Sequence, residues 1–154
     1  MVQKNITKYL ASHRQKMKHI KLRILTICLI GVDMASKHIF YNLRYWDDIQ
    51  WVLPVLNKGI SRSLPLPYVI IISISILGIG GFIRLFVKKQ ISWVIGGVLI
   101  AGTAGNLIDR FVYGWVRDFI DIGLFNFPIF NGADIMLSLG IAIWIIRVML
   151  EKKK

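Results

Sequence analysis

Two aspartates, Asp118 and Asp134, are the residues of this sequence best placed to do chemistry. Four of the eight acidic residues fall between positions 109 and 134. Asp134 opens a long apolar run, and Asp118 lies among apolar neighbours in VRDFIDI. A carboxylate next to hydrocarbon costs at least about 2.5 kcal/mol, so it is rarely kept without a partner or a purpose. For Asp134 both helix capping and catalysis remain open, because an aspartate near a helix N-terminus also binds free N–H groups.

The chemistry open to such a pair is activation of water. Two carboxyl groups that approach each other in a low dielectric cannot both ionise, so the pair holds one proton. The ionised member can take a proton from water, while the neutral member polarises a scissile carbonyl. Which member is protonated at rest is a property of the coupled pair. The histidines and the single cysteine do not show the spacing of a metal site, so we expect no metal and no cofactor.

The alternation of an extended strand selects one acid of VRDFIDI. It places Asp118 on one face and puts Asp121 on the opposite face, with Arg117 and Phe119. Only one of the two acids can then face the rest of the protein. Asp118, on the same face as Val116, is the better candidate for the buried side.

Further polar residues lie inside apolar segments. Asp33 and Lys37 are four residues apart and share a helix face, as do Asn106 and Arg110. Polar groups at membrane depth face a bundle interior or a cavity. We therefore expect a polar pocket that opens outward between helices.

The elements that position these residues are membrane helices. The 154 residues are 55% hydrophobic and 18% charged, with a mean hydropathy of +0.59, which is typical of a membrane protein. A backbone in lipid must satisfy its own hydrogen bonds, so helices are the default. We predict a single all-α membrane domain over 1–154: a four-helix bundle with a small extracytoplasmic β-hairpin or cradle and an outer lid loop. The predicted parts are a basic tail 1–21, helices 22–43, 66–87, 91–109 and 133–150, and outer loops 44–65 and 110–132.

Charge and small residues refine this prediction. Lys and Arg concentrate before the first apolar run, in the break at 84–89 and at the C-terminus, so both termini are expected to be cytoplasmic. The net charge of +12 then favours a membrane surface over nucleic acid. Gly97, Ala101 and Gly105 recur every four residues and permit close helix packing. Cys28 is expected to be a small buried hydrophobic residue.

Five short motifs resemble those of the lipoprotein signal peptidases, also called signal peptidase II. Their order, spacing and position at the outer ends of the predicted helices all agree, over roughly residues 20–150. The motifs are Asp33-x-x-Ser36-Lys37, Asn57-x-Gly59, Gly105-Asn106-x-x-Asp109-Arg110, Val116-x-Asp118-Phe119 and Phe130-Asn131-x-Ala133-Asp134.

The resemblance implies a metal-independent aspartic endopeptidase of the bacterial cytoplasmic membrane. Such enzymes cut the signal peptide from a prolipoprotein just before a cysteine that carries diacylglycerol. The implied partners are lipid-modified prolipoproteins and membrane lipids, and the implied state is a monomer. The catalytic residues would be Asp118 and Asp134. The substrate-binding and supporting residues would be Asp33, Lys37, Asn57, Gly59, Asn106, Asp109, Arg110 and Asn131.

The chain departs from the family pattern at Ile60, Arg62, Arg117 and Gly132, which bears on substrate preference and lid geometry but removes no catalytic group. A lid over the substrate would be built from aromatic and apolar residues of the second outer loop. The candidates are Trp115, Phe119, Leu124, Phe125, Phe127 and Phe130.

Two other function classes remain as alternatives. A non-catalytic four-span scaffold or transport subunit would use the polar residues to pack helices or conduct ions. A membrane hydrolase acting on lipid phosphates would need a cluster of Arg, Lys and His on the outer side, which is poor in them.

Overall fold

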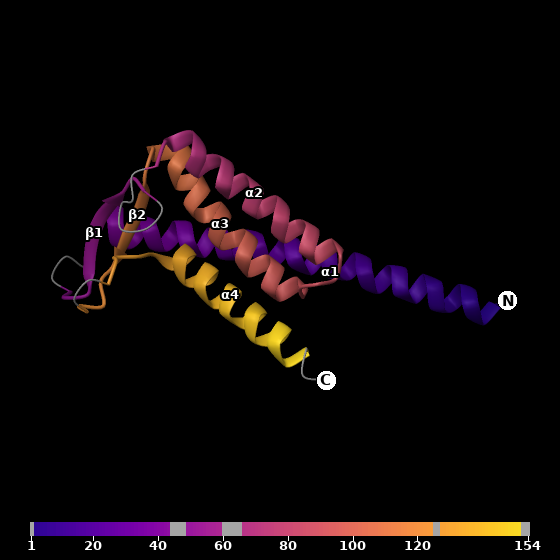
Figure 1. Cartoon of the computed structure of the whole chain (residues 1–154). Helices are drawn as coiled ribbons and strands as arrows, with labels where there is room; N and C mark the ends of the chain where they lie inside the picture. The colour runs from indigo at the N-terminus through magenta and orange to yellow at the C-terminus, as the bar shows by residue number, and fades with distance from the viewer. Residues whose placement is uncertain (1, 44–48, 60–65, 125–126, 152–154) are drawn as a thin grey trace.

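The computed structural model describes residues 2–43, 49–59, 66–124 and 127–151 (Figure 1). Within them, four helices are long and apolar enough to cross a membrane, as predicted. They are α1 (Val2–Lys37), α2 (Tyr68–Val87), α3 (Trp93–Tyr113) and α4 (Gly132–Glu151). A short π-helical segment, η1 (His38–Asn42), continues α1. The termini lie at the opposite end of the bundle from the strands.

The first helix is much longer than expected. It begins at Val2 rather than near residue 22, so the basic segment is part of a helix. No proline or glycine occurs before Gly31, so nothing in this stretch breaks the backbone pattern. Figure 1 shows the N-terminal part of α1 projecting past the other helices.

Helix α3 is the centre of the bundle and packs against α1, α2 and α4. Its small residues permit this: a Cβ on Gly97 would lie 2.9 Å from Leu25 of α1, and one on Gly102 would lie 2.6 Å from the Ala133 carbonyl oxygen. The predicted close-packing face is confirmed. The helix also runs one turn further than expected, and Gly114, with φ 82°, ends it.

The outward faces of α1, α2 and α4 carry exposed aliphatic side chains, as a lipid environment requires. Cys28 lies on such a face. The expectation that it is buried was wrong, because a weakly polar thiol is tolerated in hydrocarbon and needs no place in the core.

A two-stranded antiparallel sheet lies at the outer end of the bundle. Strand β1 (Val52–Asn57) comes from the first outer connection and β2 (Val116–Ile120) from the second, with Val55 opposite Asp118 and Asn57 opposite Val116. The register shifts between Val52 and Val55, where Pro54 has no N–H to donate. The expected small sheet is present, but it is not a hairpin, because it joins two segments some 60 residues apart.

Strand β2 is buried on both faces. Asp118 is buried as predicted, while Asp121 is only half-buried. Arg117 and Phe119, on the opposite face, are buried as well, and the Phe119 ring stacks on Phe40 of η1 at 5.2 Å. The strand is therefore enclosed between the helices and η1 instead of resting on a surface.

The contact at Gly102 gives a test of the packing. Gly102→Ala should destabilise the protein by about 1–3 kcal/mol, because the new methyl group meets rigid backbone of α4. Gly80→Ala in α2 is the matched control, since nothing lies within 4 Å of its Cβ position. That variant should be unchanged or slightly more stable. Thermal unfolding in detergent measures both, and equal midpoints for the two variants would contradict the packing.

Candidate active site

Asp134 is both a helix cap and a site residue. Asn131 is the N-cap of α4, since its carbonyl accepts from Ile135 N–H. Its side-chain Oδ1 accepts from Asp134 N–H at 3.1 Å, and Asp134 Oδ2 accepts from Asn131 N–H at 3.2 Å. This reciprocal capping box fixes the carboxylate and leaves Oδ1 to accept from Asn106 Nδ2 at 2.8 Å. The capping contacts therefore orient the Asp134 carboxylate and leave its Oδ1 available for a contact outside the capping box.

Asp118 lies deeper, with 2% of its surface exposed. Its Oδ1 accepts from Asn131 Nδ2 at 2.6 Å and its Oδ2 from Asn57 Nδ2 at 2.9 Å. Burial and, next, the negative charge of Asp134 raise the pKa of this carboxyl, the two amide hydrogen bonds lower it, and the net pKa is about 7. A carboxyl with this pKa keeps its proton for much of the time at neutral pH.

Two amide side chains connect the aspartates. Asn131 Nδ2 donates to Asp118 and also to Asn106 Oδ1 at 3.1 Å, while Asn106 Nδ2 donates to Asp134. The orientation of Asn106 is set by Lys37, whose Nζ donates to the same Oδ1 at 3.1 Å. Because Oδ1 must face the ammonium group, Nδ2 must face Asp134. The structure thus joins Asp118 and Asp134, predicted from sequence, through one continuous network.

Beneath this network lies a buried ionic cluster. Lys37 is fully buried, and its ammonium group lies 2.8 Å from Asp33 Oδ2 and 3.4 Å from Asp109 Oδ2. The predicted Asp33–Lys37 pair is confirmed. Asn106 Oδ1 is the third partner, so two carboxylates and one amide oxygen surround the Lys37 charge. Glycine at 132 leaves space for Asp33, because a Cβ there would lie 3.2 Å from its Oδ1.

Arg117 completes the cluster, a role that the sequence did not indicate. Its guanidinium lies 2.7 Å from Asp109 Oδ1, and its backbone N–H donates to Asp109 Oδ2 at 3.0 Å. Nη1 also donates to Asn42 at 2.8 Å, and the group lies 4.4 Å from the Tyr113 ring centroid. Arg117 therefore ties β2 to α3 and η1, next to Asp118 in the chain.

Arg110 holds the end of β1. Its Nη2 donates to the Gly59 carbonyl at 3.1 Å, and Gly59 N–H donates to Asn57 Oδ1 at 3.0 Å. Asn57 is thereby oriented with its Nδ2 toward Asp118. The Tyr68 hydroxyl donates to the Arg110 carbonyl at 2.5 Å, a contact that no sequence motif predicted.

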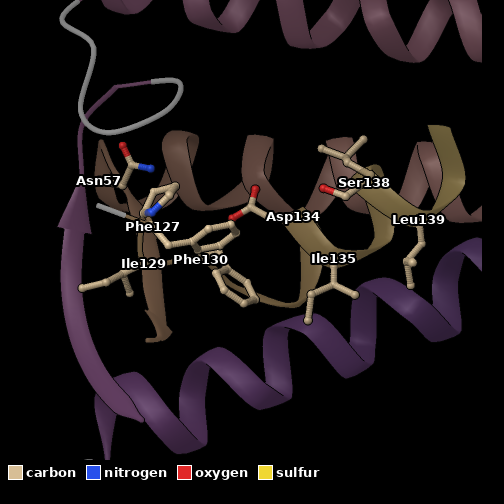
Figure 2. Close-up of a pocket in the computed structure, with 10 residues that line it drawn as sticks. Asn57, Phe127, Ile129, Phe130, Asp134, Ile135, Ser138 and Leu139 are labelled. Atoms are coloured by element: carbon tan, nitrogen blue, oxygen red, sulfur yellow. The ribbon is translucent and has the colours of Figure 1, made fainter. Parts of the chain in front are cut away.

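An apolar cavity of about 510 Å³ adjoins Asp134 (Figure 2). Figure 2 shows Asn57 and Asp134 on its wall, with the Phe127 and Phe130 rings between β1 and α4. The expectation of a polar pocket around Asp33, Lys37, Asn106 and Arg110 was wrong: none of the four lines this cavity, because their side chains are buried in contacts with other polar groups. The full lining is Asn57, Phe127, Pro128, Ile129, Phe130, Asp134, Ile135, Leu137, Ser138 and Leu139.

The candidate lid residues have different positions. Phe127 and Phe130 contact each other and line the cavity, whereas Phe119 is buried against η1. Trp115 lies 6.4 Å from the Tyr113 ring, and Leu124 is exposed. The remaining predicted positions lie outside the described residues: Phe125, Ile60 and Arg62.

Comparison with known proteins identifies the family. The profile of the family described as signal peptidase (SPase) II matches residues 25–150. A lipoprotein signal peptidase of Thermodesulfovibrio yellowstonii is 32% identical over 143 residues, which cover 85% of this chain and 96% of that protein. This chain belongs to the signal peptidase II family. A second lipoprotein signal peptidase, from Gloeothece citriformis, is 38% identical over 134 residues and covers 77% of this chain and 82% of its own.

The signal peptidase II fold agrees with a solved structure. A bacterial membrane enzyme determined by the in meso method superposes with a TM-score of 0.70 at 25% identity, covering 86% of this chain and 89% of that one. The chain is thus a multi-pass membrane protein of a peptidase family. Within the described residues, no group of three or more His, Cys, Asp and Glu is placed to hold a metal ion.

The buried ion pair of this signal peptidase II gives a second test. Arg117→Met should destabilise the protein by about 3–5 kcal/mol, because Asp109 loses a buried partner. Arg147→Met is the control, since the Arg147–Glu151 pair is exposed and contributes at most about 1 kcal/mol. Thermal unfolding of both variants in the same detergent gives the comparison. Similar small losses would show that Arg117 does not anchor β2.

Proposed function

We propose that this chain is an intramembrane aspartic endopeptidase that removes signal peptides from diacylglyceryl-modified prolipoproteins, cutting before the lipidated cysteine. The supporting observation is the amide network that joins Asp118 of β2 to Asp134 of α4 beside an apolar cavity. The lipoprotein signal peptidases among its relatives support the substrate class. A scaffold or transport subunit is not favoured by these relatives.

The proposed roles of the two aspartates differ. Asp118, with its raised pKa, holds the shared proton, and Asp134 is the ionised member at the cavity wall. Asp134 takes a proton from water as the water oxygen attacks the scissile carbonyl carbon, and Asp118 donates a hydrogen bond to the carbonyl oxygen. The carbon–nitrogen bond then breaks, and the proton taken by Asp134 passes to the departing amine.

Asn57 would guide the substrate into this arrangement. Its Nδ2 now donates to Asp118 Oδ2, the oxygen nearest β1. A scissile carbonyl that reaches Asp118 replaces this contact, and the Asn57 amide is then free to donate to the substrate backbone. Gly59 and Arg110 keep Asn57 in place from behind.

The buried residues would act indirectly. Asp33, Lys37 and Asp109 are completely or almost completely buried, so we propose that they position Asn106 and β2 instead of binding substrate directly. Asn106 and Asn131 hold the two carboxyls in register.

Membrane placement follows the same reasoning. The signal helix and acyl chains of a prolipoprotein partition into the bilayer, so an apolar cavity at the outer end of the bundle receives them without passage through water. We propose that both termini are cytoplasmic, as the positive charges indicate. We also propose a monomer, because one chain supplies both carboxyls and the cavity.

The first test of this function is the loss of each carboxyl. Asp118→Asn and Asp134→Asn should each reduce cleavage of a diacylglyceryl prolipopeptide roughly 1,000-fold or more, because neither amide can exchange the required proton. Cleavage by purified protein in lipid, followed by release of the signal peptide, is the measurement. Asp121→Asn is the control, since this half-buried side chain only accepts from Gly123 N–H and should leave the rate unchanged.

Retained cleavage in either dyad variant would contradict the aspartic mechanism. Failure of the unmodified protein to cut any of several lipidated substrates would contradict the function itself. Circular dichroism of each variant establishes that the helices are intact.

The pH dependence gives an independent test. Because the pKa of Asp118 is raised to about 7, the form with one proton on the pair is lost as pH rises through that value. The cleavage rate should therefore fall on the alkaline side of neutrality, since two ionised carboxylates cannot polarise the carbonyl. The cleavage rates of the unmodified protein and of Asp121→Asn, measured against pH, should both show this decrease. A rate that stays constant or increases through neutral pH would contradict the assignment of the proton to Asp118.

A further inference from the structure

Two adjoining cavities lie at the end of the bundle opposite the candidate active site. One, of about 160 Å³, is enclosed by α1, the turn between α2 and α3, and Arg147 of α4. The other, of about 380 Å³, lies further along α1 and is lined by Arg14, Lys18 and Lys89 among others. Gln15, Lys18 and Lys89 line both. We call the two together the basic cleft.

The basic cleft is strongly cationic. Arg14, Lys18, Lys89 and Arg147 line it, and no acidic residue does so in the described part of the chain. The ion pairs found among the described residues do not involve Arg14, Lys18 or Lys89, whereas Arg147 pairs with Glu151. In the sequence, no acidic residue precedes Asp33. Three cations from two separate segments thus converge with no acidic partner among the described residues.

The backbone at Lys89 is unusual as well. Its φ is 60°, a left-handed conformation that ends α2 and that glycine adopts most easily. Among the described residues, it is the one non-glycine residue with a positive φ. Lys89 thus places a positive charge at the cleft, at a position where glycine would adopt the backbone conformation more easily.

The cleft lies at the level of lipid headgroups. Helix α3 has 21 residues and is about 31 Å long, which matches the hydrocarbon thickness of about 30 Å. Its first residue, Trp93, lines the cleft and has Lys21 Nζ 5.8 Å from its ring centroid. Tryptophan prefers the membrane interface, so the cleft lies where phosphate groups are found.

One face of α1 carries an apolar stripe that runs from the part projecting past the other helices to the bundle (Figure 1). Ile6, Leu10, Met17 and Ile20 are exposed and follow one another at three-, four- or seven-residue steps, so they form one stripe. The stripe continues into Ile24, which is exposed among the lipid-facing residues of the bundle.

We propose that the basic cleft binds the phosphate of an anionic phospholipid in the leaflet at the terminal end of the bundle. Lys18 and Lys89 supply the charge from the two sides, and Ser92 and Gln15 add polar groups at the wall. Phe86 and Ile91 also line the cleft but are buried in the core, so the acyl chains would follow the exposed aliphatic faces of the helices. This site is separate from the proposed catalytic pair, so its test does not depend on cleavage.

Native mass spectrometry of the full chain in detergent tests the proposal, with phosphatidylglycerol, phosphatidylcholine and inorganic phosphate as the probes. The unmodified protein should retain phosphatidylglycerol in preference to phosphatidylcholine. Lys18→Gln with Lys89→Gln should weaken that retention roughly thirtyfold, which corresponds to about 1 kcal/mol for each of the two cations. Lys18→Arg with Lys89→Arg should retain it, because the charge is kept.

The matched control removes the same charge elsewhere on α1. Lys8→Gln with Lys16→Gln changes two exposed residues that line neither cavity and should leave retention within about twofold. Equal losses in the two glutamine pairs would overturn the proposal in favour of diffuse attraction. Equal retention of the two lipids would overturn the proposal, because it would show that the cleft does not select an anionic headgroup. Displacement of phosphatidylglycerol by inorganic phosphate at a similar concentration would also overturn it, in favour of a site for a soluble anion.

Discussion

The cost of leaving a charge unpaired at membrane depth governs the outer half of this protein. Lys37 cannot be buried there unless nearby acceptors compensate its positive charge. Asp33, Asp109 and Asn106 supply them, and the demand on Asn106 then fixes which end of its amide faces Asp134. A requirement of solvation in α1 therefore orients the carboxyl in α4. A buried network with some polar groups left unpaired is costly, so the positions of Asp118 and Asp134 follow from pairing the polar groups of the entire network.

The same constraint accounts for the proton on the pair. The outer polar region contains four acids (Asp33, Asp109, Asp118 and Asp134) and three bases (Lys37, Arg110 and Arg117). This group is electrically neutral when one acid is protonated. Asp118, buried and close to Asp134, is the acid whose pKa is raised to about 7. Arg117 contributes here even though it faces away from the cavity. Because it neutralises Asp109, the group needs only one bound proton to be electrically neutral.

The sequence predicted those features that depend on local spacing. Apolar run lengths gave the four spans, the four-residue separation gave the Asp33–Lys37 pair, and alternation gave the buried face of Asp118. Features that depend on distant segments were missed. The pairing of β1 with β2, the Tyr68–Arg110 contact and the role of Arg117 each need the tertiary arrangement, because their partners lie far away or on another element. The start of α1 was missed for another reason: a basic, polar stretch carries no hydropathy signal even when it is helical.

The pairing of β1 with β2 also sets an order of assembly. When a ribosome has delivered α1, β1 and α2 to the membrane, the Asn57 Nδ2 group lacks its acceptor, because Asp118 has yet to be synthesised. Asp134, on the last helix, arrives later still, and its capping box forms only as α4 enters the bilayer. A nascent or prematurely terminated chain consequently lacks both the neighbour of Asp118 and the wall of the cavity. A chain that ends before α4 therefore cannot complete the amide network that joins the two carboxyls.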